Sequence, residues 1–128
     1  MILLLDTSTP ICKLSFVDGD WRYDTEWEAG RQLAKDLLGF LQSELHGQNK
    51  GWEDLTGLVS FLGPGSFTGL RIGITVLNSL AYARTVPIVG EVGETWQDQG
   101  IARLLAGEND QIVLPHYGGE ANITKPRK

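Results

Sequence analysis

The sequence has very little sulfur and histidine and no long apolar run. Its single cysteine, Cys12, can form neither an internal disulfide nor a zinc site built from several cysteines. The two histidines, His46 and His116, are far apart with no neighbouring ligand pattern, so no metal site is indicated. The apolar start "MILLL" is too short for a signal peptide or a membrane span. We therefore expect a cytoplasmic protein without a membrane partner.

Positive charge is also scarce. The chain of 128 residues has 11 Lys and Arg against 16 Asp and Glu, a net charge of −5. This balance argues against a protein that binds nucleic acid alone, because contacts from Lys and Arg to phosphate supply most of that affinity. Lys125, Arg127 and Lys128 form a basic end, which we interpret as solubilising rather than as an RNA contact. The length predicts one domain with a modest core.

The apolar pattern changes from strand-like to helix-like along the chain. Residues 12–17 and 21–28 alternate on either side of the turn Asp18-Gly19-Asp20, which predicts antiparallel strands. Helical periodicity begins after Gly30. The expected strands are residues 2–5, 12–17, 21–28, 55–62 and 86–90, and the expected helices are 30–47, 66–84 and 94–107.

This order of elements predicts an α/β fold. It reads βββ-α-β-α-β-α, followed by an extended segment at 111–117. Three antiparallel strands followed by αβ units give a mixed five-stranded sheet with helices on its faces. The RNase H-like fold, which is also half of the actin-like architecture, is the natural candidate. We expect a single domain over residues 1–117 and a C-terminal tail at 118–128.

A glycine-rich loop, "FLGPGSFTGLRIG" at residues 61–73, joins the fourth strand to the second helix. It has no lysine and lacks the spacing of a P-loop or of a dinucleotide-binding loop. A weak alternative is an anion or nucleotide site at the helix N-terminus, made by Asp6, Gly63, Gly65 and Ser66. The plainer interpretation is a tight turn in which Ser66 caps the helix and further glycines allow close packing.

The second helix is apolar over an arc of about 200°, more than one sheet can cover. Its remaining face is small and mostly neutral, and it comprises Arg71, Thr75, Asn78, Ser79 and Tyr82. Such a face indicates that something covers it. The cover is either another chain or the last helix and tail of the same chain, and the sequence leaves both open.

An enzymatic site is poorly supported. An RNase H-type nuclease needs several carboxylates around two metal ions, and only Asp6 is in the right position. Glu44 is the nearest companion, while Glu91 and Glu94 are interpreted as charges at the N-terminus of the last helix. Cys12 shows no sign of thiolate activation, so a packing role is expected. We expect no catalytic residue, cofactor or metal.

Three stretches together resemble the TsaB (YeaZ) family: "ILLLDTST" at 2–9, "GPGSFTGLRIG" at 63–73 and "VPIVG" at 86–90. The resemblance implies that residues 1–92 correspond to the first domain of a two-domain actin-like protein. The chain leaves no room for the second domain, so we expect an internal deletion after about Gly90. "ARLLAG" and Pro115-His116-Tyr117 resemble the end of full-length members, which makes 94–107 the terminal helix.

The resemblance also implies a function. Members of this family are non-catalytic subunits of the machinery that makes threonylcarbamoyladenosine (t6A) in tRNA. They bind the transferase TsaD, and the ATPase TsaE joins the assembly, so contact with tRNA is indirect. The family's interface is a helix bundle, here residues 31–46 and 66–85, which also allows self-dimerisation. The interface residues carried over are Leu33, Leu37, Leu41, Leu70, Ile74, Leu77, Asn78 and Ala81.

Overall fold

A computed structural model of the protein describes residues 1–115. The predictions for His116, Tyr117 and the basic tail at 118–128 lie outside the described residues. The observed order of strands and helices confirms the predicted βββ-α-β-α-β-α. The elements are β1 (Ile2–Asp6), β2 (Ile11–Asp18), β3 (Trp21–Glu28), α1 (Leu33–Gly47), β4 (Gly57–Phe61), α2 (Phe67–Arg84), β5 (Ile88–Glu91) and α3 (Trp96–Leu105).

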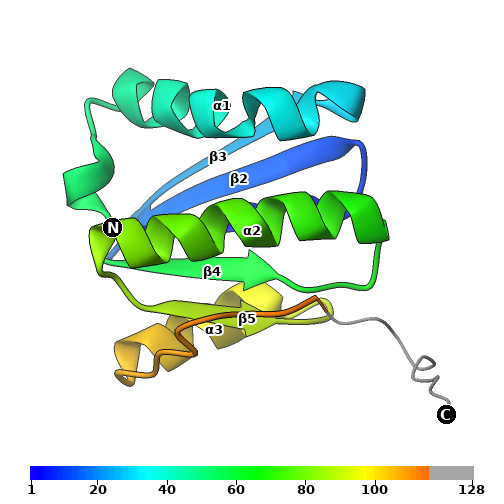
Figure 1. The fold of residues 1–128 in the computed structure, drawn as a ribbon. Coiled ribbons are helices and arrows are strands. Elements are labelled where there is room, and N and C mark those ends of the chain that lie inside the picture. The colour runs from blue at the N-terminus through cyan, green and yellow to red at the C-terminus, as the bar shows by residue number, and fades with distance from the viewer. Residues whose placement is uncertain (116–128) are drawn as a thin grey trace, which may run out of the picture.

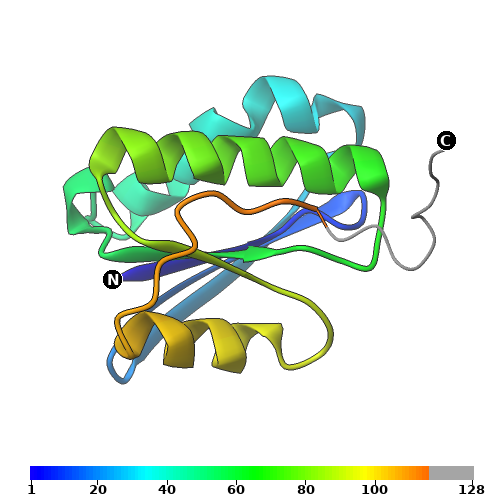
Figure 2. The same ribbon diagram turned by 60° about the horizontal axis from the view of Figure 1, so that its bottom comes forward.

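The strands form one mixed five-stranded sheet in the order β3-β2-β1-β4-β5. β1 to β3 are antiparallel neighbours, whereas β1, β4 and β5 run parallel, as the connections through α1 and α2 require. Figure 1 shows α1 and α2 side by side, and Figure 2 shows that both cover one face of the sheet while α3 covers the other. The predicted α/β architecture is therefore confirmed.

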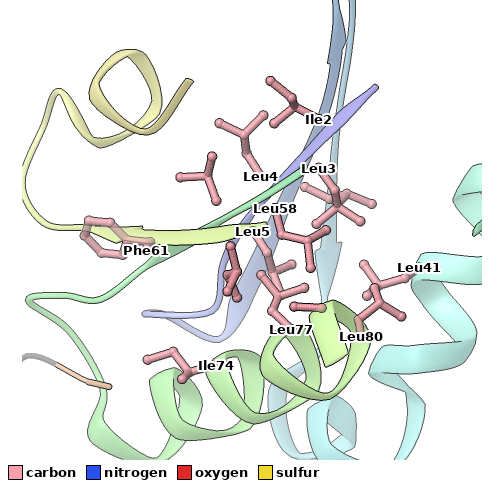
Figure 3. Packing of buried hydrophobic residues seen from close by; sticks show 14 of the residues in the cluster. Ile2, Leu3, Leu4, Leu5, Leu41, Leu58, Phe61, Ile74, Leu77 and Leu80 are labelled. Carbon is pink, nitrogen blue, oxygen red and sulfur yellow. The ribbon is translucent and has the colours of Figure 1, made fainter. Parts of the chain in front are cut away.

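The core lies on both faces of β1 and β4. Leu3 and Leu5 alternate with Leu4 along β1, and all three are buried because the strand is covered on both sides. Figure 3 shows Leu4 on the opposite side of β1 from Leu3 and Leu5. On the α3 face, Gly100 packs against Val59 so closely that a β-carbon there would lie 2.3 Å from a Val59 methyl.

Two predicted helix ends are confirmed. The Ser66 hydroxyl accepts a hydrogen bond of 3.3 Å from the backbone N–H of Gly69, which caps α2. Gly107 follows α3 with a φ of +87°, a left-handed conformation that glycine adopts without strain. α1 is preceded by a short 3-10 turn at Gly30–Gln32, so its regular part begins at Leu33 rather than at Gly30.

The segment after α3 settles what covers one side of α2. Residues 109–115 run beside α2, as the orange trace of Figure 2 shows. The Asn78 side chain donates to the Val113 carbonyl at 2.9 Å and accepts from the Val113 N–H at 3.0 Å.

The prediction for Glu91 was wrong: it is the last residue of β5, and its carboxylate pairs with Arg103 at 2.9 Å rather than serving α3 as an N-terminal charge.

Candidate functional site

The loop between β4 and α2 packs directly on the turn between β1 and β2. The Ser66 N–H donates to the Ser8 carbonyl at 2.8 Å. One turn later, the Thr7 hydroxyl donates to the Gly69 carbonyl at 2.7 Å. Thr7 and Ser8 are both buried, which is rare for a surface turn and shows how tightly the two segments meet.

One glycine of the loop and two glycines in the first turns of α2 make this contact possible. A β-carbon at Gly65 would lie 2.3 Å from the Ser8 β-carbon, and one at Gly69 would lie 2.3 Å from the Thr7 carbonyl oxygen. At Gly73 it would lie 2.3 Å from the Thr7 hydroxyl. A gap that excludes a methyl group also excludes a phosphate, so the close approach favours packing over the weak alternative of an anion site between these two loops.

Asp6, the other residue of that alternative, is used locally. Its Oδ1 accepts a hydrogen bond of 2.8 Å from the Ser8 N–H, which closes the turn after β1. Burial, and secondarily the nearby Asp6 carboxylate, raises the pKa of the Cys12 thiol to about 12. No three His, Cys, Asp or Glu side chains within residues 1–115 come together as a metal-binding group. Neither the nuclease nor the nucleotide alternative gains support from this geometry.

The predicted interface residues lie in the protein's own core. Their side chains face the sheet or the neighbouring helix, and each retains at most 6% of its surface: Leu33, Leu37, Leu41, Leu70, Ile74, Leu77 and Ala81. Asn78, the eighth, is half-buried and holds Val113. In this structure the seven apolar side chains offer almost no surface to another molecule. A direct role for them at an interface stays a prediction, and the available surface must be sought beside them.

One such surface lies between α1 and α2. Two adjacent grooves, of about 360 and 490 Å³, share Ala34, Thr68 and Ile72. Thr75 and Val76 continue the first groove along α2, and Thr9 and Pro10 close the second groove at the β1–β2 turn. Ile72 and Val76 are half-buried and belong to the apolar arc of about 200° predicted for this helix, in which the sequence did not separate a buried centre from a half-exposed edge. Their position at the edge of the arc is the signal that would have distinguished them.

The groove surface is positively charged, although the protein is acidic. Arg31 and Arg71 line it, and none of the described lining residues is acidic. The Arg71 guanidinium lies 5.3 Å from the centre of the Phe67 ring, a ring that is 48% exposed. Small side chains, half-exposed aliphatic residues and two arginines suit a protein partner that carries carboxylates. The surface of these two grooves between α1 and α2 is the candidate functional site.

Comparisons with known proteins match this chain to one family model and to several curated relatives. The family model described as tRNA N6-adenosine threonylcarbamoyltransferase (TsaD) matches residues 27–91. The tRNA threonylcarbamoyladenosine biosynthesis protein TsaB of Escherichia coli is 30% identical over 112 residues, which cover 82% of this chain and 48% of the relative. TsaB of Haemophilus influenzae is 29% identical, with 84% and 46% covered. The chain spans about half the length of these curated relatives.

Solved structures agree. YeaZ from Pseudomonas aeruginosa superimposes with a TM-score of 0.67 at 27% identity, covering 77% of this chain and 49% of that one. A further protein, described as similar to the peptidase YEAZ of the same organism, gives a TM-score of 0.66 at 28% identity and covers 71% of this chain and 42% of that one.

Within residues 1–115 no helix is both long and apolar enough to span a bilayer.

Proposed function

Since the chain belongs to the TsaB (YeaZ) branch of the TsaD family, we propose that it acts in t6A synthesis as a non-catalytic subunit that binds a TsaD-type transferase. The observation that carries the proposal is the groove surface between α1 and α2. It combines half-exposed aliphatic side chains with a helix face that has no acidic residue. The relatives' names support the proposed pathway, and the groove surface supports the proposed mode of action.

A binding role agrees with the geometry of the two loops that meet at the start of α2. The turn at Asp6 and the loop at Gly65 meet through backbone atoms and small side chains, so they position α2 rather than a substrate. The pKa of the lone thiol is raised far above neutral pH, which makes it a poor nucleophile. These observations favour the scaffold over the nucleotide-binding enzyme and the nuclease.

We propose that the partner lays an apolar helix against the α1–α2 grooves. Ile72 and Val76 would contact its apolar side, while Arg31 and Arg71 would pair with carboxylates at its rim. Pairs at such a rim mainly steer association and fix orientation. In the absence of the transferase, two copies of this chain can meet through the same face about a twofold axis.

The test is co-elution of the full chain with the TsaD-type transferase of its own organism in size-exclusion chromatography. Asn78 is unsuitable for mutation because it holds Val113. Thr75→Arg instead places a large cation in the centre of the exposed face, and we expect it to abolish co-elution. Gln99→Arg likewise introduces an arginine at an exposed position, but on α3, on the other face of the sheet, and is expected to leave binding intact.

Failure of the unmutated chain to co-elute would overturn the proposal, and so would binding that Thr75→Arg leaves untouched. Adding a TsaE-like ATPase to the same column shows whether a third component joins. A tRNA shift assay on the chain alone completes the design. We expect no shift, because tRNA contact in this proposal is indirect and the chain carries a net charge of −5.

A further inference from the structure

The two edges of the sheet are protected in different ways. β3 forms one edge and carries alternating charged residues, Arg22, Asp24, Glu26 and Glu28, all exposed. Charge of this kind prevents an edge strand from pairing with another chain. β5 forms the other edge, and from Ile88 to Gly90 it has no charged residue and no proline. Its protection must come from elsewhere.

That protection comes from residues 109–115, here called the strap. The Ile88 N–H donates to Asn109 Oδ1 at 3.1 Å, and the Ile88 carbonyl accepts from the Asp110 N–H at 2.8 Å. The Gly90 N–H donates to Asp110 Oδ2 at 3.0 Å. The Gly90 carbonyl accepts from Arg103 Nη1 at 3.1 Å. All four outward backbone groups of Ile88 and Gly90 are thus bonded, three of them by the strap.

The strap is held at two points. Near its start, the Arg103 guanidinium pairs with Asp110, with Glu108 at 2.7 Å and with Glu91 at 2.9 Å. Further along, the Asn78 side chain forms two hydrogen bonds with the backbone of Val113. Val113 is the one buried apolar side chain of the strap at 4% exposure, whereas Ile112 is 67% exposed and Leu114 is 72% exposed. The strap is therefore held by polar contacts and by a single buried side chain, and segments with so little apolar burial open more readily than a core strand.

We propose that the strap is a detachable cover, and that β5, once uncovered, pairs with β5 of a second copy. Two copies of one edge related by a twofold axis lie antiparallel and are self-complementary. The uncharged stretch Ile88–Gly90 would supply the pairing groups. The charged β3 edge cannot serve in this way. This association is separate from the α1–α2 face and does not depend on the proposed function.

The perturbation is the double variant Asn109→Ala, Asp110→Ala, which removes both side-chain acceptors of the β5 edge. We expect amide hydrogen exchange at Ile88 and Gly90 to accelerate about tenfold or more in dilute solution, with Leu58 on the inner ladder unchanged. At rising concentration, light scattering should report a dimer. Leu114→Ala, which changes an exposed strap side chain, is the matched control and should behave like the parent.

A peptide of residues 107–115, added in trans, tests the site directly. It should return the dimer of the double variant to monomer, whereas a peptide with alanine at both changed positions should not. The dimer should also persist when Thr75→Arg blocks the α1–α2 face. Unchanged exchange at Ile88 and Gly90 would overturn the cover, and a monomer with a freely exchanging edge would overturn the pairing. If the double variant does not fold, Asn109→Ala alone keeps the Asp110–Arg103 pair and is judged by the same measurements.

Discussion

Gly69→Ala probes the contact that sets the position of α2. Gly69 is in the first turn of the helix, and its carbonyl accepts the hydrogen bond from the Thr7 hydroxyl. A β-carbon there would meet the Thr7 carbonyl oxygen at 2.3 Å, a backbone atom that cannot rotate away. Either the helix or the β1–β2 turn must therefore move.

The expected cost follows from three terms. Crowding a closely packed site costs about 1–3 kcal/mol. Displacing the Gly69 carbonyl weakens its hydrogen bond from Thr7, at about 1 kcal/mol. Alanine returns up to about 1 kcal/mol through its better helix propensity. The sum predicts that the variant loses about 1–3 kcal/mol of its free energy of unfolding.

Gly39→Ala is the matched control. Gly39 lies inside α1, and a β-carbon there would meet nothing within 4 Å, so only the propensity term remains. This variant should gain up to about 1 kcal/mol. Urea unfolding followed by circular dichroism measures both free energies. If Gly69→Ala were as stable as Gly39→Ala, the close approach of α2 to the β1–β2 turn would be refuted.

Three further outcomes are expected. Thr7→Ala should partly restore the stability that Gly73→Ala loses, because a β-carbon at Gly73 meets the Thr7 hydroxyl and methyl groups. It should not restore the stability of Gly69→Ala, because the atom in the way there is the Thr7 carbonyl oxygen. Urea titrations of each single and double variant measure both effects. A disulfide reagent at about pH 8 should label Cys12 only after denaturant is added, because its pKa of about 12 keeps the buried thiol protonated. The hydrogen bond from Arg22 lowers the pKa of Asp24, so Asp24→Asn should be less stable than the parent at neutral pH. That difference should vanish as the pH falls through the lowered pKa, which unfolding curves across acid pH will measure.

Much of the fold could be predicted from the sequence because local signals agreed with one another. The alternation in β2 and β3 and the turn at Gly19 specify a hairpin, and the structure has a φ of +61° there. Ser66 as a cap and Gly107 as a stop were similarly local. The α3 start was placed two residues early, at Glu94, because an acidic residue near a helix start is only a weak boundary signal.

The candidate site was less predictable, because it depends on where distant segments lie. The apolar arc of α2 was found, but the sequence did not show that residues 109–115 return along its side. The contact between Asn78 and Val113 joins residues 35 apart, and no periodicity encodes it. Glu91 was misassigned for the same reason, since its partner Arg103 approaches only after α3 folds back on β5.

α2 is restrained on three sides, and this restraint would favour the partner binding proposed for its remaining side. The glycine contacts fix its start against the β1–β2 turn, Leu70 and Leu77 fix its base on the sheet, and Asn78 ties its flank to the strap. A helix already held in place loses little conformational freedom on binding, so more of the contact energy remains as affinity. The stretch 61–73 therefore both lines the α1–α2 grooves and fixes where they lie. By allowing the helix to sit deep on the turn, its glycines set the position of the α1–α2 grooves.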